Sequence, residues 1–99
     1  MLDHTPGTAE VLPRIADAVK GKIKIMVDGG VRSGVDVLKM LALGADVVMI
    51  GRPVAIAALG GGKQGVVKYL AKIKAELTSA MVVTGCATIN DIDPRILAV

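Results

Sequence analysis

Two apolar runs, each followed by a glycine-containing turn and the start of a helix, set the strongest limit on how this chain folds. Residues 23–27 run into a turn at 28–32, and residues 45–50 run into a turn at 51–53. Apolar runs of this length, rich in β-branched residues, are typical of strands covered on both faces in a parallel sheet. Two consecutive strand–turn–helix units therefore predict an α/β fold whose strands run parallel through a right-handed crossover.

Helical spacing of apolar residues predicts the remaining elements. We expect helices over residues 8–20, from Ser33 to Leu43, a short one over 53–59 that ends at Gly60-Gly61-Gly62, and the longest over 64–83. Pro13 fits the first helix only within its first turn, which favours a start near Glu10 or a kink. Ser33 and Asp36 have the spacing of a capping box. We expect the first and the longest helix to cover one face of the sheet, and the polar residues of the longest helix to point to solvent (Lys68, Lys72, Lys74, Glu76).

Each turn combines glycine with an arginine, Arg32 in the first and Arg52 in the second. Glycine lets the backbone approach a ligand closely, the N–H groups at a helix start attract anions, and a guanidinium adds charge and donors. A (β/α)8 barrel holds a phosphate in this way, on the loops after its last two strands. The turns therefore predict one phosphate site, although Gly29-Gly30 alone is equally consistent with a tight corner.

Composition narrows the class of protein. The 99 residues fit one domain, whereas a complete (β/α)8 barrel needs about 250. The apolar fraction is 53%, with no Phe or Trp and one Tyr, so we expect an aliphatic core. The net charge of +3 is spread along the chain without aromatic residues for base stacking, which argues against a nucleic-acid partner. One cysteine, no signal-peptide pattern and no membrane-length apolar run predict a cytoplasmic protein without a metal site.

Three other residues have candidate chemistry with a simpler explanation. His4 is the one imidazole in the sequence, but it lies in a loop before a helix, so we expect no catalytic role. Cys86 has no basic neighbour in sequence and is interpreted as a buried thiol. Tyr69, on the longest helix, is expected to serve packing, away from both turns. We therefore name no catalytic residue.

The stretch Asp28-Gly29-Gly30-Val31-Arg32-Ser33-Gly34-Val35-Asp36-Val37, followed by Ala42-Leu43-Gly44-Ala45 and Ile50-Gly51-Arg52-Pro53, resembles the FMN-dependent 2-hydroxy-acid oxidases and dehydrogenases. The similarity to this glycolate oxidase and lactate oxidase family extends to Leu2-Asp3 and to Thr84-Gly85-Cys86, and so covers nearly the whole chain. In that family the segments are strands seven and eight of a (β/α)8 barrel, with their helices. The resemblance implies that residues 1–99 are one partial barrel domain: two parallel strands with flanking helices, incomplete as a barrel on its own.

By position, the resemblance implies FMN as cofactor, with its phosphate between the two turns. Asp28, Gly29, Gly30 and Arg32 would line one side of the phosphate, and Gly51 and Arg52 the other. The two arginines would neutralise the phosphate, while backbone N–H groups at Gly30, Gly51 and Arg52 would donate to it. Asp28 would accept from a ribityl hydroxyl or anchor the turn.

In the family, a His-Gly-(Gly or Ala)-Arg stretch carries the catalytic base and the substrate-carboxylate ligand. It precedes the segment that matches Leu2-Asp3, so the expectation is half a cofactor site without the base. Because a two-stranded sheet has two unpaired edges, we also expect self-association or a partner chain that supplies the rest of the barrel. Two alternatives stay open: a non-catalytic assembly or folding module, and another phosphate-binding barrel such as the IMP dehydrogenase type.

Overall fold

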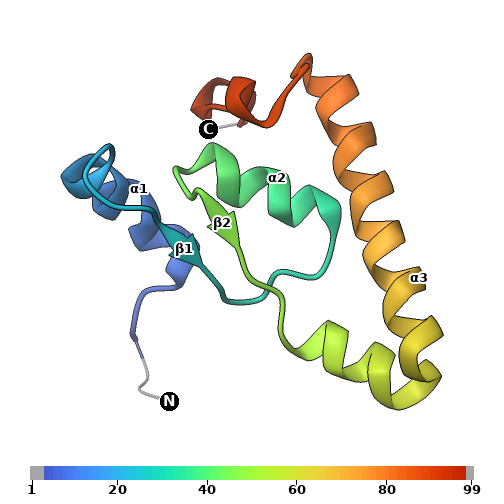
Figure 1. Cartoon of the computed structure of the whole chain (residues 1–99). Helices are drawn as coiled ribbons and strands as arrows, with labels where there is room; N and C mark the ends of the chain where they lie inside the picture. The colour runs from blue at the N-terminus through green and yellow to red at the C-terminus, as the bar shows by residue number, and fades with distance from the viewer. Residues whose placement is uncertain (1–3, 98–99) are drawn as a thin grey trace.

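The computed structural model describes residues 4–97, so Leu2-Asp3, at one end of the family resemblance, lies outside the described part. Its order is helix, strand, helix, strand, helix and two short 3-10 turns (Figure 1). The elements are α1 (Thr8–Val19), β1 (Met26–Val27), α2 (Gly34–Ala42), β2 (Val47–Val48), α3 (Arg52–Thr84), η1 (Ile89–Asp91) and η2 (Pro94–Ile96). The α/β class and the order of elements agree with the sequence-based prediction.

The two strands are parallel, as predicted, but much shorter than the apolar runs. Met26 pairs with Val47 and Val27 with Val48. Residues 22 and 23 stay outside the ladder because their N–H groups donate to the Val19 carbonyl, in the turn that ends α1. Asp46 then starts the ladder, since its Oδ2 accepts from the Ile25 N–H at 2.8 Å. The predicted strand of residues 23–27 therefore starts too early but ends correctly at Val27, and the predicted strand of residues 45–50 is too long at both ends.

One face of the sheet is covered by helices, and the other is open. Val27 is 6% exposed and packs with Leu12 and Ala16 of α1 and with Met40 of α2. Met26, which points to the opposite face, is 62% exposed. The prediction that the longest helix covers the sheet is wrong: α2 takes that place, and α3 packs on α2 (Figure 1).

Helix α1 begins at Thr8, where the Gly7 carbonyl accepts from the N–H groups of Glu10 and Val11. The alternative start near Glu10 is wrong, and Pro13 lies inside the helix. None of the helices in the described residues is long and apolar enough to span a membrane.

Helix α3 consists of two arms joined at Gly62, whose φ of 58° and ψ of −147° are not helical. This bend corresponds to the predicted break at Gly60-Gly61-Gly62 and turns the second arm back along the first (Figure 1). At Gly65 the second arm lies so close to the first that a Cβ would overlap the Ala57 carbonyl oxygen. The helix ends at Gly85, in the left-handed conformation typical of a C-terminal cap.

The second arm of α3 packs against α2 around Leu38 and Ala42, and the chain end closes this cluster. Gly34 marks the closest approach, because a Cβ there would lie 2.5 Å from the Ile73 carbonyl oxygen and would overlap the Leu77 nitrogen. The fold therefore places the start of α2 directly against α3.

Candidate functional site

Arg32 and Arg52, predicted from two separate turns, line a single hollow of about 570 Å³. Arg32 belongs to the turn after β1, and Arg52 is the first residue of α3. Pro53, Ile56 and Ala57 of the first arm of α3 form an apolar wall, and Tyr69 of the second arm completes the lining. The two arginines thus line one pocket at the carboxyl ends of the strands.

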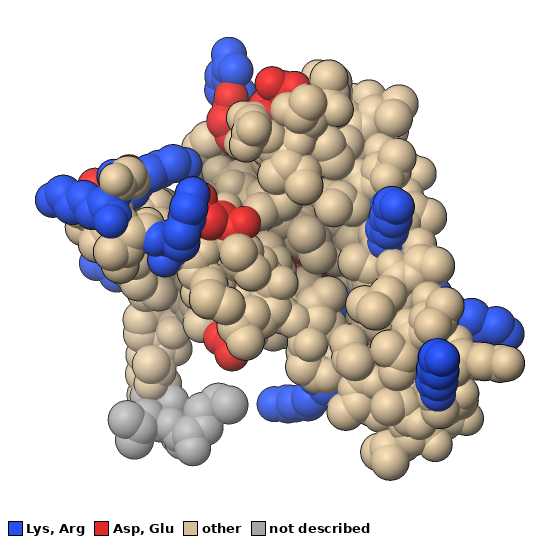
Figure 2. Space-filling view, viewed as in Figure 1, with Lys and Arg blue, Asp and Glu red and all other residues tan. Residues whose placement is uncertain are grey.

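The positive charge of this hollow is not neutralised within the described residues. The ion pair within the described residues joins Arg95 to Asp93, near the carboxyl end of the chain and outside the hollow. Another basic group, the lysines of the turn between α1 and β1, lies at the opposite end of the strands and gathers at the left of Figure 2 (Lys20, Lys22, Lys24). An anion would therefore find two unpaired guanidinium groups at the end of the sheet where the glycine turns lie.

The backbone at Arg32 is held from both sides. Its N–H donates to Asp36 Oδ2 at 3.1 Å, and its carbonyl accepts from the Tyr69 hydroxyl at 2.7 Å. Ser33 Oγ accepts from the Asp36 N–H at 3.2 Å, as half of the predicted capping box requires. The other half is wrong, because the Asp36 carboxylate accepts from Arg32 rather than from the Ser33 N–H. With the backbone fixed, the Arg32 guanidinium is available to a ligand.

Tyr69 is a functional candidate that the sequence analysis missed. The expectation that it lies away from both turns is wrong, since it contacts the first turn and lines the hollow. Burial raises the pKa of the phenol, and the nearby carboxylates of Glu76 and Asp36 raise the pKa further. Spacing gave a usable signal, because Tyr69 lies one helical turn before Ile73, the buried residue of α3.

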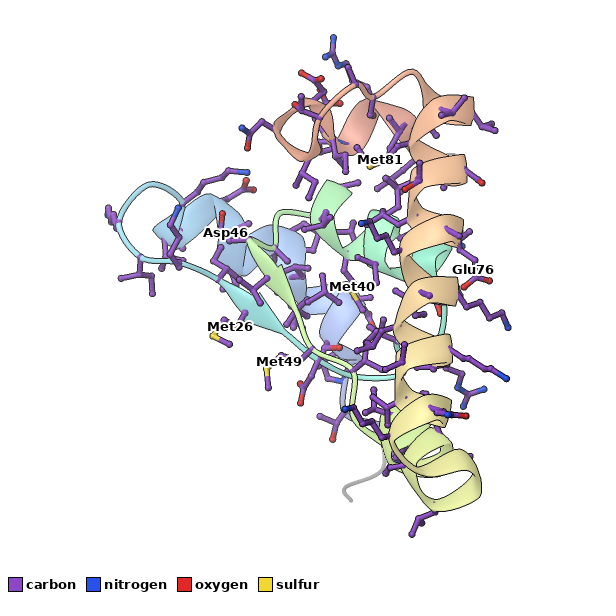
Figure 3. All side chains as sticks on the ribbon, turned by 45° about the vertical axis from the view of Figure 1, so that its right-hand side comes forward. Met26, Met40, Asp46, Met49, Glu76 and Met81 are labelled. Atoms are coloured by element: carbon purple, nitrogen blue, oxygen red, sulfur yellow. The ribbon has the colours of Figure 1, made fainter. Side chains whose placement is uncertain are left out.

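Glu76 is the second correction on α3. Its Oε1 accepts from the Gly34 N–H at 3.2 Å, so the side chain does not point to solvent as predicted. Figure 3 labels it on the long second arm. This carboxylate supplies a partner to an N–H group at the start of α2, which has no partner within the helix.

The other residues predicted for the first side of the phosphate lie at the same turn but do different things. Gly29 has a φ of +114° and faces Thr8, whose Oγ1 would lie 2.6 Å from an added Cβ. The Thr8 hydroxyl also donates to the Asp28 carbonyl at 2.7 Å, so the main chain of Asp28 anchors the turn. Gly30 has a φ of +70°, and nothing lies within 4 Å of a Cβ built on it. It lines a neighbouring hollow with Val31 and Asp36 rather than the hollow of the two arginines.

On the second side, Gly51 is the N-terminal cap of α3. Its carbonyl accepts from the N–H groups of Val54 and Ala55, and no atom would contact a Cβ built on it. Pro53 has no N–H group and Val54 donates to Gly51, so the N–H of Arg52 is the first-turn donor without an intrahelical acceptor, at the positive end of the helix dipole. A backbone donor therefore lies next to the Arg52 side chain.

The two residues set aside earlier lie elsewhere. Cys86 is buried, as predicted, in the cluster between α2 and the chain end. His4 is exposed in the loop before α1, with a positive φ of 65°. No group of His, Cys, Asp and Glu side chains in the described range is arranged to hold a metal ion.

Comparisons with known proteins identify the family that the chain resembles. The sequence model of the FMN-dependent dehydrogenase family matches residues 1–99. A 2-hydroxyacid oxidase of Dictyostelium discoideum is 48% identical over 96 residues, which are 97% of this chain and 25% of that protein. A peroxisomal (S)-2-hydroxyacid oxidase of Arabidopsis thaliana is 46% identical and is covered to the same 25%.

A solved structure is also similar. A lactate oxidase of Pediococcus acidilactici superposes with a TM-score of 0.89 at 40% identity, over 95% of this chain and 26% of that one. The chain thus spans about a quarter of the length of the proteins it matches. Because the family model matches residues 1–99 of this chain and these relatives are similar to it, the chain belongs to the FMN-dependent dehydrogenase family.

Proposed function

We propose that this chain is the FMN-phosphate-binding portion of an FMN-dependent 2-hydroxy-acid oxidoreductase with a lactate-like or glycolate-like substrate. The observation that carries the proposal is the single hollow lined by Arg32 and Arg52. The family match supplies the identity of the ligand.

The residues present fit a phosphate. Two guanidinium groups without a carboxylate partner in the described residues match a dianion in charge, and each offers a fork of donors. The N–H groups of Gly51 and Arg52 would add main-chain donors at the start of α3. Gly30 would donate from the opposite turn, and Asp28 would accept from a ribityl hydroxyl.

The apolar part of the hollow fits a ligand that continues beyond its phosphate. Pro53, Ile56 and Ala57 provide a wall without charge. Such a wall excludes water from one side of the phosphate, which strengthens its interaction with the arginines.

In a complete enzyme, bound FMN would supply the acceptor for a hydride from the α-carbon of the hydroxy acid. The share of this chain is to hold the anionic end and fix its orientation. The sequence contains no His-Gly-(Gly or Ala)-Arg stretch, and its one histidine, His4, lies in an exposed loop. The proposal therefore assigns removal of the hydroxyl proton and binding of the substrate carboxylate to residues outside these 99.

We also propose that residues 1–99 form one partial domain, equivalent to the last two strand–helix units of a (β/α)8 barrel. The open sheet face and the two unpaired strand edges support association with further strands, from a second copy or from the remainder of such a barrel.

Flavin titration tests the phosphate site. FMN and riboflavin differ only in the phosphate, so the wild-type chain is expected to bind FMN more tightly, measured by flavin fluorescence. Arg32→Ala and Arg52→Ala are each expected to weaken FMN binding about two- to tenfold, a moderate effect because exposed charge pairs are moderate in strength. Neither variant is expected to change riboflavin binding, because riboflavin lacks the phosphate. Arg14→Ala, which removes an exposed arginine of α1, is the matched control.

Equal affinity of the wild-type chain for the two flavins would contradict the proposal. So would a loss of FMN affinity in Arg14→Ala as large as in the two site variants.

A further inference from the structure

We propose that Tyr69 is a positioning residue of this site: through its bond to the Arg32 carbonyl it fixes the first turn so that Arg32 faces Arg52 across the hollow. The inference rests on the proposed function for the identity of the ligand. The geometry that supports it does not depend on the ligand.

The bend of α3 at Gly62 brings the required groups together. The first arm carries Arg52 at its start, and the second arm carries Tyr69. The close approach of the arms at Gly65 fixes their separation. One helix thus supplies one wall of the hollow and the group that holds the opposite wall.

The hydrogen bond of Tyr69 is one of three that side chains make to the backbone at residues 32–34. The Tyr69 hydroxyl donates to the Arg32 carbonyl at 2.7 Å. Asp36 accepts from the Arg32 N–H at 3.1 Å, and Glu76 accepts from the Gly34 N–H at 3.2 Å. Two of the three partners, Tyr69 and Glu76, come from the second arm of α3.

The contact at Gly34 makes the role of Tyr69 specific. Gly34 already lies against the backbone of α3, so the helix approaches the turn with or without the phenol. At Arg32, two residues earlier, the Tyr69 hydroxyl is the group of α3 that bonds to the backbone. Loss of the hydroxyl should therefore free the carbonyl of Arg32 and allow its side chain to turn away from the hollow, while α2 and α3 stay packed.

Tyr69 acts through Arg32. Its hydroxyl proton is engaged by a protein acceptor, and its ring is part of the lining. The benefit to a ligand is pre-organisation, because a side chain already directed into the hollow loses less freedom on binding.

Tyr69→Phe tests the proposal, since it removes the hydroxyl and keeps the ring. We expect FMN affinity to fall about three- to tenfold, the range for one hydrogen bond, with riboflavin affinity unchanged. Thr78→Val is the matched control: it removes another hydroxyl of the same arm, one that donates to the Lys74 carbonyl within the helix. A general loosening of the fold would weaken the binding of FMN and of riboflavin alike. Equal losses of affinity for the two flavins, or no loss of FMN affinity, would therefore overturn the proposal.

Amide hydrogen exchange separates this proposal from the function on which it rests. Faster exchange at residues 32–36 in Tyr69→Phe, but not in Thr78→Val, is expected whether or not FMN binds. If the wild-type chain does not distinguish FMN from riboflavin, the proposed function fails. The exchange rates at residues 32–36 still decide whether Tyr69 fixes the turn through the Arg32 carbonyl. Unchanged exchange would overturn the role of Tyr69 in fixing the turn.

A measurement on the wild-type chain covers the case in which the variant does not fold. Tyr69 is the one tyrosine of the chain, so the NMR resonance of a 13C label at the tyrosine Cζ reports its ionisation alone, also in the presence of a flavin. A bound phosphate in the shared hollow adds negative charge beside Glu76 and Asp36, and should raise the pKa of Tyr69 when FMN saturates the chain. An unchanged pKa of Tyr69 at FMN saturation would mean that the phosphate does not bind in the hollow that Tyr69 lines.

Discussion

Gly34 is the glycine at which an added Cβ would come closest to its neighbours. A Cβ there would overlap the Leu77 nitrogen and lie 2.5 Å from the Ile73 carbonyl oxygen, both backbone atoms that cannot rotate away. We expect Gly34→Ala to lower the free energy of unfolding by about 1–3 kcal/mol, the range for overpacking, in chemical denaturation.

The matched control is Gly60→Ala, on the first arm of α3, where nothing lies within 4 Å of an added Cβ. Alanine favours a helix, so this variant should be neutral or more stable by up to about 1 kcal/mol. If the two variants unfold at the same denaturant concentration, the close approach of α2 and α3 at Gly34 is wrong.

Asp93 and Arg95 make a prediction about pH. Hydrogen bonds from the side chain and the N–H of Arg95 hold the pKa of the Asp93 carboxyl below its ordinary value. A lowered carboxyl pKa contributes stability above the ordinary pKa and loses it as pH falls through the folded-state value. Because the pair is exposed, we expect a small effect on stability. Arg95→Ala should raise the pKa of Asp93 toward its ordinary value in an NMR titration; an unchanged pKa would mean that the pair does not form.

Among the elements, the bend of α3 makes the sharpest prediction. Gly62 has φ 58° and ψ −147°, which an L-residue rarely adopts, but which are the mirror image of a conformation common to all residues. We expect L-alanine at position 62 to cost about 1–3 kcal/mol and to reduce the preference for FMN over riboflavin, because Arg52 and Tyr69 lie on opposite sides of the bend. Denaturation and flavin titration measure the two effects.

A chain made by chemical synthesis with D-alanine at position 62 provides the control. A D-residue adopts this conformation without strain, so its stability and flavin preference should equal those of glycine. Equal behaviour of the L- and D-alanine chains would show that α3 does not need this bend.

Element order and type could be read from local signals, such as the apolar runs, the spacing within each helix, Ser33 as a cap, and the break at Gly60-Gly61-Gly62. Strand length could not, because it depends on partners distant in sequence. Ile23 has a strand-like side chain, but its N–H group is taken by the Val19 carbonyl. Likewise, periodicity identified the apolar face of the longest helix but not that α2 lies between that helix and the sheet.

The arginines of the candidate site could be predicted because glycine, arginine and a helix start are adjacent in sequence at each turn. Tyr69 and Glu76 could not be assigned in the same way. They reach the first turn only through the bend at Gly62, across 37 residues for Tyr69 and 42 for Glu76. Their helical spacing places both on the face of Ile73, but only packing shows what that face contacts.

For the whole molecule, the open face of the sheet is the dominant feature. Met26, Val47 and Met49 are 62, 46 and 48% exposed, and Figure 3 shows Met26 and Met49 projecting away from the ribbon, whereas Met40 lies among the helices. Both strands also have an unpaired edge. An apolar patch beside free strand edges favours association.

We expect the wild-type chain to sediment as an oligomer at micromolar concentration, and Met26→Glu with Met49→Glu to shift it toward monomer. Charges on that face would be buried without partners in any assembly that covers it. Leu59→Glu is the matched control, since Leu59 is apolar and 90% exposed but lies near the bend of α3. A wild-type monomer, or equal dissociation by Leu59→Glu, would contradict this role of the sheet face.

The return of α3 along itself also orders events in time. During synthesis the chain emerges from its amino end, so both arginines leave the ribosome before Tyr69 and Glu76, the residues of α3 that hold the first turn. The hollow lined by Arg32 and Arg52 is complete only when the second arm of α3 has emerged and brought Tyr69 to the first turn. A ribosome paused before Tyr69 would hold a chain with both arginines and an unfinished hollow.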